Sequence, residues 1–374
     1  MNTLALLYIM PRKLSWVSLF RIPNLSSWQF LQAVNIVAAS TIVGMSYAIF
    51  GDGFSSFIPF INGSIIGLLG GVGLSAGELL LFKSIRQRIT FLGIVILKSA
   101  SYTLMMVVII FTVILISRSL QNGEVLTTTF NSAPFQHFLL HEDFFIIICY
   151  AMTFISILIF TREMSRKMGQ GVLLSFITGR YFKPKLEKRI FMFLDMKSSV
   201  SKAERLGDLE YHNLLRDFFR DITDCILSAQ GKIHHYVGDE VVVSWPLSAN
   251  TKTERCLKAY FQSLNKIQSL QEYYLSTYGL IPQFKAAFHC GEVIYGEIGE
   301  VKSEIVFHGD VVNTTARLER LCSTMEENIL VSKTLIDTFP VNVQQNFRTV
   351  GQIMLRGKER SLEVFGVNPE VALV

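Results

Sequence analysis

The chain has 374 residues, of which 50% are hydrophobic and 17% are charged, and its mean hydropathy is +0.38. The apolar excess lies before residue 162, in stretches long enough to cross a bilayer, which excludes a wholly soluble globular protein. The formal net charge is +5, but the basic residues gather beside those stretches and in the segment that follows them. We therefore expect a lipid surface as their partner and no nucleic acid.

Four apolar stretches in the N-terminal half predict transmembrane helices. A helix that crosses the hydrocarbon core needs about 20 apolar residues. The fourth stretch is shorter but contains no charged residue. We predict a cytoplasmic segment over residues 1–28 and then a transmembrane domain over residues 29–161. Its four helices are expected at about 29–50, 57–82, 91–116 and 144–160.

Basic residues flank these stretches on one side of the membrane. The loops predicted on the other side carry Asp52 and a single basic residue, Arg118. Because cytoplasmic loops are enriched in Lys and Arg, both termini are predicted to lie in the cytoplasm of a multi-pass protein of the cell membrane. The flanking basic residues are Arg12, Lys13 and Arg21 before the first stretch, Lys83, Arg86 and Arg88 after the second, and Arg162, Arg166 and Lys167 after the fourth.

Two charged residues stand inside the predicted spans. Glu78 and Lys98 lie toward the cytoplasmic ends of the second and third stretches. They either pair with each other across that helical hairpin or extend separately to the polar membrane surface. We favour separate extension, known as snorkelling.

Residues 162–189 are basic throughout and predict a juxtamembrane linker. Apolar residues around Leu173 and Phe176 favour a short helix, which Gly169 and Gly171 interrupt. The linker either transmits events in the membrane to the C-terminal domain or tethers that domain passively to anionic lipid. The sequence leaves both alternatives open.

Residues 190–374 alternate strand-like and helix-like patterns, which predicts an α/β domain with a largely antiparallel sheet. The short apolar run over 190–194 is interpreted as a buried strand, and Asp195 follows at its end. Gly238 and Asp239 stand between two strand-like runs, which indicates a hairpin with Asp239 at its tip. Two carboxylates at neighbouring strand ends suit Mg²⁺ or Mn²⁺, since magnesium takes one or two protein carboxylates together with substrate phosphates. A turn-forming role for each aspartate is the alternative.

A later segment predicts a helix with one polar face. Gly309 and Asp310 indicate its start, with Asp310 as the N-cap. Asn313 and Arg317 are four residues apart and point the same way, so the Arg can contact a phosphate oxygen while the Asn contacts a sugar or a water. A solvated surface, which Arg320 shares, is the alternative. The apolar face consists of Val311, Thr314, Leu318 and Leu321.

From Lys188 to about Val367 the chain resembles the catalytic domain of the class III nucleotidyl cyclases, the adenylate and guanylate cyclases. The resemblance covers half of the chain and implies a ferredoxin-like α/β fold. It rests on five sequence blocks in the family's order and near its spacing. These blocks are FMFLDMKSSVSKAERLG, YVGDEVVVSW, FHCGEVIYGEIG, FHGDVVNTTARLERL and LRGKERSLEVFGV.

The resemblance implies a reaction and a set of residues for it. The 3′-hydroxyl of ATP would attack the α-phosphate in line, which yields 3′,5′-cyclic AMP and pyrophosphate. No nucleophilic Ser or Cys is needed. The family also implies a head-to-tail homodimer in which each site takes its metal ligands from one protomer and its Asn and Arg from the other. By the resemblance Asp195 and Asp239 hold two Mg²⁺ or Mn²⁺ ions, Asn313 orients the ribose, Arg317 stabilises the transition state, and Arg356 or Lys358 holds the terminal phosphates.

Two positions depart from the family's pattern and bear on the base. Where the family reads adenine with Lys and Asp or Thr, and guanine with Glu and Cys, this chain has His235 and Val306. Val306 offers no hydrogen bond, so one polar contact to the purine is missing. We favour ATP over GTP because no acidic residue stands at the position that would read guanine.

Other functions are compatible with parts of the sequence. Val306 gives some support to a catalytically weak or inactive domain that binds nucleotide as a regulatory module, and a guanylate cyclase is a further alternative. VGDEV is a near match to the diguanylate cyclase signature, but the FHGDVVNTTAR block argues against that class. A transporter or channel is disfavoured because the apolar stretches are neither discontinuous nor strongly polar.

Overall fold

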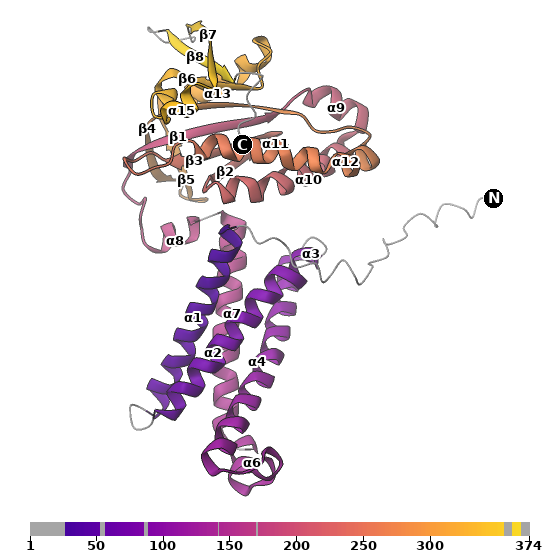
Figure 1. Ribbon diagram of the computed structural model, residues 1–374, viewed down its shortest axis with the longest axis vertical. Helices are drawn as coiled ribbons and strands as arrows, with labels where there is room; N and C mark the ends of the chain where they lie inside the picture. The colour runs from indigo at the N-terminus through magenta and orange to yellow at the C-terminus, as the bar shows by residue number, and fades with distance from the viewer. Residues whose placement is uncertain are drawn as a thin grey trace, which may run out of the picture. The chain divides into compact units, whose positions relative to one another are not determined.

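The computed structural model describes residues 27–52, 57–85, 89–140, 142–169, 171–354 and 361–367. The chain divides into two compact units, Met1–Met164 and Ser165–Val374, and each is described by itself. Figure 1 labels their helices and strands.

The N-terminal unit is helical. Three of its helical segments, Ile58–Leu81, Phe91–Asn122 and Phe144–Met168, are long and apolar enough to cross a membrane, and Phe30–Ser46 is a shorter apolar helix. The four predicted stretches are therefore helical, while the number of spans stays a prediction. The elements are α1 (Ser27–Asp52), α2 (Ile58–Ala76), the π-helical turn η2 (Gly77–Leu81), α3 (Phe82–Ile85), α4 (Phe91–Asn122), α5 (Leu126–Asn131), α6 (Ala133–Leu140) and α7 (Glu142–Met168).

Glycines bring α1 and α2 together along their length. A Cβ atom added to Gly63 would lie 2.2 Å from the carbonyl oxygen of Gly44, and one added to Gly67 would lie 2.4 Å from that of Ser40. Small residues at such positions let two helix backbones approach closely, as is common between membrane helices. The two helices run side by side in Figure 1.

Snorkelling of Glu78 and Lys98 was the wrong prediction. The Lys98 side chain is fully buried, and its Nζ lies 2.5 Å from Glu78 Oε1 and 2.7 Å from Glu163 Oε1. The second carboxylate comes from α7, so the buried ammonium is enclosed by three helical segments. A buried charge requires such partners.

The helix α7 is longer than the predicted fourth span. It continues to Met168, so the segment expected to be a linker from residue 162 begins inside a helix. Its added residues include Glu, Met, Arg and Lys, which are good helix formers. Gly169 then takes a positive φ of 100°, a conformation that favours glycine and ends the helix. The predicted short helix of the linker is α8 (Val172–Ile177).

The C-terminal unit contains a mixed sheet, and within the described residues its order is β2-β3-β1-β4-β6-β8-β7, with β5 paired to β4. Among the described strands β4 and β6 pair in parallel and the other pairs are antiparallel, so the prediction of a largely antiparallel sheet is confirmed. The strands are β1 (Lys185–Met196), β2 (Lys232–Val237), β3 (Glu240–Pro246), β4 (Phe284–Ile298), β5 (Glu304–His308), β6 (Ile329–Ser332), β7 (Phe347–Ile353) and β8 (Leu362–Val367).

Helices cover both faces of this sheet. Alternate residues of β1, such as Met192, enter a core shared with α10 to α12, while Phe191 and Phe193 pack on the other face with Val311 of α13. Asp195 follows Phe193 by two residues in β1, so its side chain lies on the same face of the sheet as Phe191 and Phe193, the face that α13 covers. The remaining helices are α9 (Ser199–Leu206), α10 (Asp208–Ser228), α11 (Arg255–Ser269), α12 (Gln271–Tyr278), α13 (Asp310–Thr324), α14 (Lys333–Ile336) and α15 (Val341–Gln344).

Candidate active site

Asp195 stands near the end of β1, at the centre of the sheet. Its register partners are Glu240 of β3 on one side and Lys285 of β4 on the other. The side chain is 20% exposed, and Lys285 Nζ lies 3.5 Å from its Oδ2. The strand is longer than the expected run over 190–194 and includes Asp195, which is the last residue but one of β1.

Asp239 lies at the tip of the β2–β3 hairpin, which confirms the predicted turn. Val237 pairs with Glu240, so Gly238 and Asp239 form a two-residue connection, and Gly238 has the positive φ of 63° that such turns require. Among the described residues, Asp239 Oδ2 is buried and has no hydrogen-bond partner. A buried carboxylate oxygen without a donor is costly, which marks this atom as a ligand position.

Carboxylates converge at this point of the domain. The pKa of Asp195 is raised to about 7 by burial first, and then by the negative charges of Asp239 and Glu319, which outweigh the opposing effect of Lys285. The pKa of Glu240 is also raised to about 7, by burial and then by Glu319 and Asp239. The folded chain therefore concentrates more negative charge here than its own lysine balances.

The pair Asp195 and Asp239 fits a divalent cation. An ion between these carboxylates would remove their mutual repulsion and would engage the unpartnered Asp239 oxygen. No group of three or more His, Cys, Asp or Glu side chains suited to a metal occurs in the described part of the chain. Two carboxylates agree with magnesium, which completes its shell with water and substrate phosphates.

The helix α13 carries the predicted Asn and Arg. Its buried face contains Val311, Thr314 and Leu318, as expected, whereas Asn313 is exposed and Arg317 is partly exposed. One detail of the prediction is wrong. Gly309 occupies the N-cap position and Asp310 is the first helical residue. Gly309 fits there because a Cβ would lie 3.0 Å from the carbonyl oxygen of Glu292.

Within one chain, Glu319 connects α13 to Asp195 through Lys285. Lys285 Nζ lies 2.9 Å from Glu319 Oε1 and 3.5 Å from Asp195 Oδ2, so the lysine links the helix to β1. Asn313 and Arg317 stand earlier on the helix. Their roles toward a substrate remain predictions.

His235 and Val306 lie on neighbouring segments. The His235 ring is 5.7 Å from the ring of Phe307, which follows Val306 in β5. Both side chains are partly exposed. The adjacent His234 has further polar contacts: a bulge in β2 falls at its position, and its Nε2 lies within hydrogen-bond distance of Ser244 Oγ (2.8 Å) and Tyr295 Oη (2.9 Å). Desolvation and the nearby cations Lys232 and Arg189 hold the pKa of His234 well below its usual range, so its ring is neutral.

Arg356 and Lys358, the predicted partners of the terminal phosphates, lie outside the described residues. Sequence reasoning also missed residues that shape the site, namely Lys285, Glu319 and Glu240. A lysine inside the apolar run FKAAF was an available signal, because a charge within a buried strand needs a partner. The identity of that partner depends on how α13 packs on the sheet.

Comparisons with known proteins agree with this geometry. Residues 183–368 match the family model of the adenylate and guanylate cyclase catalytic domain. The chain is 35% identical over 221 residues to adenylate cyclase 2 of Rhizobium meliloti (strain 1021), which covers 59% of this chain and 61% of that protein. It is 24% identical over 185 residues to an adenylate cyclase of Anabaena cylindrica, which covers 47% of this chain and 36% of that protein. The matches thus span less than two thirds of these relatives.

Among solved structures, a bacterial light-regulated adenylyl cyclase is similar with a TM-score of 0.51. The two share 22% sequence identity, and the match covers 62% of this chain and 67% of the other. At this identity the similarity concerns the fold. Together with the family match, it identifies the C-terminal unit. Through residues 183–368, this chain belongs to the adenylate and guanylate cyclase catalytic domain family.

Proposed function

We propose that the protein is a membrane-bound nucleotidyl cyclase that converts ATP to 3′,5′-cyclic AMP and pyrophosphate. The observation that carries the proposal is the carboxylate pair of Asp195 and Asp239, in which a buried oxygen has no hydrogen-bond donor among the described residues and the Asp195 pKa is raised to about 7. The pair belongs to a domain of the cyclase family. Phosphate and divalent metal are the ligands that such a pair attracts.

Asp195 and Asp239 would hold Mg²⁺ or Mn²⁺, which when bound supplies a Lewis acid to the 3′-hydroxyl and to the leaving pyrophosphate. Arg317 would stabilise the charge that develops on the α-phosphoryl oxygens, and Asn313 would orient the ribose. Arg356 or Lys358 would hold the terminal phosphates. The chemistry then rests on positioning and electrostatics.

ATP is the proposed substrate, with GTP as the alternative. His235 and Val306 would meet the base, and neither is acidic, whereas a guanine-reading site needs an acceptor for the guanine N1 and amino protons. Two relatives with the names of adenylate cyclases support the same choice.

The direct test uses the full chain purified in detergent and incubated with ATP or GTP and either Mg²⁺ or Mn²⁺. Cyclic AMP from ATP supports the proposal, and cyclic GMP as the main product supports a guanylate cyclase. The absence of any cyclic product together with measurable nucleotide binding supports the inactive nucleotide-binding module, which Val306 favours.

The proposed enzyme is a homodimer with shared sites. The support is that Asp195 joins α13 through Lys285 and Glu319, while Asn313 and Arg317 stand earlier on that helix and are exposed or partly exposed. Co-expression of the Asp239→Ala and Arg317→Ala variants, each inactive alone, is expected to restore one working site in each heterodimer. Cyclase activity of the copurified pair measures this, and no recovery contradicts the shared site.

The proposed location is the cell membrane with both termini in the cytoplasm, where ATP and Mg²⁺ are available. Three helical segments long and apolar enough to cross a bilayer support it. Reporter fusions at each terminus test the orientation, and a reporter active outside the cytoplasm contradicts it.

A further inference from the structure

A charged cluster joins three helical segments of the N-terminal unit. It consists of Lys98 on α4, Glu78 in η2 and Glu163 on α7. The side chains of these residues are 0%, 12% and 6% exposed respectively, and the two Lys98 Nζ to carboxylate distances are 2.5 and 2.7 Å. Ionisable residues inside membrane helices are expensive to bury, and they mark functional positions by default.

The surroundings of the cluster are shaped to hold it. Tyr102 Oη donates to Glu78 Oε1 at 3.4 Å, and the Phe82 ring lies 5.3 Å from Lys98 Nζ. Gly77 opens the π-helical turn, and a Cβ there would lie 2.7 Å from the Tyr102 ring. Such π-helical turns are frequently found at functional sites. Neighbouring groups on two helical segments therefore contact the cluster, which distinguishes it from an isolated ion pair.

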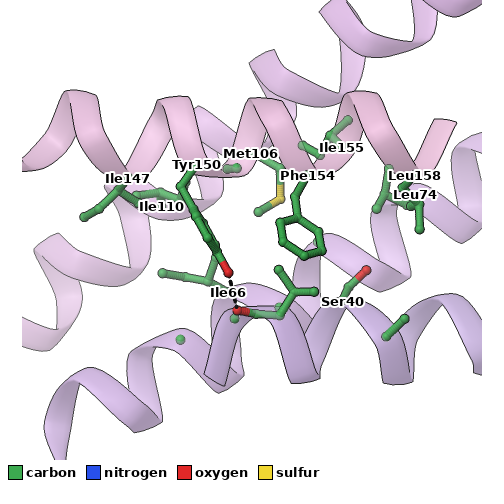
Figure 2. A pocket seen from close by; sticks show the side chains of 17 residues that line it. Ser40, Ile66, Leu74, Met106, Ile110, Ile147, Tyr150, Phe154, Ile155 and Leu158 are labelled. Carbon is green, nitrogen blue, oxygen red and sulfur yellow. Dashed lines mark hydrogen bonds between the residues drawn. The ribbon is translucent and has the colours of Figure 1, made fainter. Parts of the chain in front are cut away.

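The helix α7 depends on polar contacts for its position. Along its middle it borders an apolar cavity of about 140 Å³ that α1, α2 and α4 also line (Figure 2). On one side of this cavity Tyr150 Oη lies 3.1 Å from Ser46 Oγ of α1, and toward the C-terminal end of α7 Glu163 meets Lys98. Apolar contacts along a cavity resist a small shift of the helix weakly, whereas an ion pair of this length is lost by such a shift.

We propose that the cluster of Glu78, Lys98 and Glu163 fixes the cytoplasmic end of α7 and that this position sets the rate of the cyclase. The connection is covalent, because α7 ends at Met168 and the chain enters β1 of the catalytic domain at Lys185. These three residues are positioning residues, since none of them belongs to the catalytic domain. The inference rests on the proposed cyclase function.

The test compares full-length variants in membranes. In the triple variant Glu78→Gln, Lys98→Met and Glu163→Gln, the cluster is replaced by neutral side chains of similar size, which leaves no unpaired charge and preserves folding. The matched control is Ser46→Ala, which removes one hydrogen-bond partner of Tyr150 on α7 and leaves the cluster intact.

Two readouts are taken from each variant. One is the rate of cyclic AMP formation per folded protein. The other is the rate of disulfide formation between cysteines introduced at Phe91 of α4 and Phe160 of α7, whose rings are 6.3 Å apart. The second readout reports the position of α7 without any catalysis.

In the triple variant we expect slower disulfide formation and a cyclase rate lower by about fivefold or more, the lower end of typical coupling between sites. The Ser46→Ala control is expected to keep both rates. Slower disulfide formation with an unchanged cyclase rate would show that the cluster has only a structural role, which overturns the inference. An unchanged rate of disulfide formation overturns it as well. If the unmutated chain makes no cyclic product, the proposed function fails instead, and the cross-link alone still decides whether the cluster holds α7.

Discussion

Both halves of the molecule bury carboxylates, but they balance the charge differently. Glu78 and Glu163 share a lysine from the chain itself, at 2.5 and 2.7 Å. Asp195 and Asp239 repel each other electrostatically, and the lysine that pairs with Asp195, Lys285, is also engaged by Glu319 at 2.9 Å. The excess negative charge raises the pKa of Asp195. The comparison teaches that a buried acid in direct ionic contact with a lysine of the chain serves position, whereas a carboxylate pair with an oxygen that has no partner among the described residues is suited to a cation brought with a substrate.

The largest expected effect lies in the membrane half. Lys98→Met removes the buried ammonium that lies 2.5 and 2.7 Å from two carboxylates, and it is expected to destabilise the protein by about 3–5 kcal/mol. Denaturant unfolding of the detergent-solubilised protein measures this loss. The triple neutral variant at Glu78, Lys98 and Glu163 is the control and should be close to the unmutated chain. If Lys98→Met were as stable as the unmutated chain, the ion pairs of Lys98 would not hold the helices in position, and the contrast with the catalytic domain would fail.

The opposite behaviour is expected at the catalytic pair. Asp239→Asn removes a proposed metal ligand and one of two repelling charges, so the cyclase rate is expected to fall by at least about 100-fold, equivalent to about 2.7 kcal/mol. Stability without metal should not decrease, because the unpartnered oxygen of Asp239 contributes no hydrogen bond among the described residues. Turnover and thermal unfolding are measured on the same sample. A variant that unfolds more easily while it keeps its rate would make Asp239 structural.

The pH dependence sharpens the same contrast. The pKa of Asp195 is raised from its ordinary 3.8 to about 7, so between these values the folded state holds a proton that the unfolded state has released. The free energy of unfolding therefore falls as pH rises through this window. Added Mg²⁺ is expected to raise the unfolding temperature of the catalytic domain at pH 8 and to do so little at pH 5, where the carboxyl is protonated. Equal Mg²⁺ stabilisation at both values contradicts a metal site at this pair.

The smallest effect concerns the base. Val306→Thr adds a hydroxyl beside the position of His235 and is expected to change the ratio of ATP to GTP turnover by about fivefold in favour of ATP, since a hydrogen bond contributes about 1 kcal/mol. Val306→Ile adds bulk without a hydroxyl and serves as the control. Competition assays with both nucleotides measure the ratio. The same shift in both variants would assign the effect to shape and not to hydrogen bonding.

Local patterns sufficed for a substantial part of the catalytic domain. Three features could be predicted because they depend only on neighbours in sequence, since side-chain direction in strands and helices follows a fixed period. They are the apolar run before Asp195, the Gly-Asp turn at Asp239 and the spacing of Asn313 and Arg317 on one helix. The apolar stretches of the N-terminal half likewise indicated helices by length and composition alone. The predicted N-cap at Asp310 failed by one residue, because close packing against Glu292 favours Gly309 there.

The amino-acid sequence by itself determined the helical and α/β halves, the family of the catalytic domain and the presence of an acid at each of two strand ends. Only the tertiary structure decided which charges meet. Glu163 joins Lys98, and Glu319 joins Lys285, across long separations in sequence that helix packing and strand register close. The physical reason is that a buried ion pair depends on distances of a few ångströms between segments, and no periodic pattern along the chain encodes such distances.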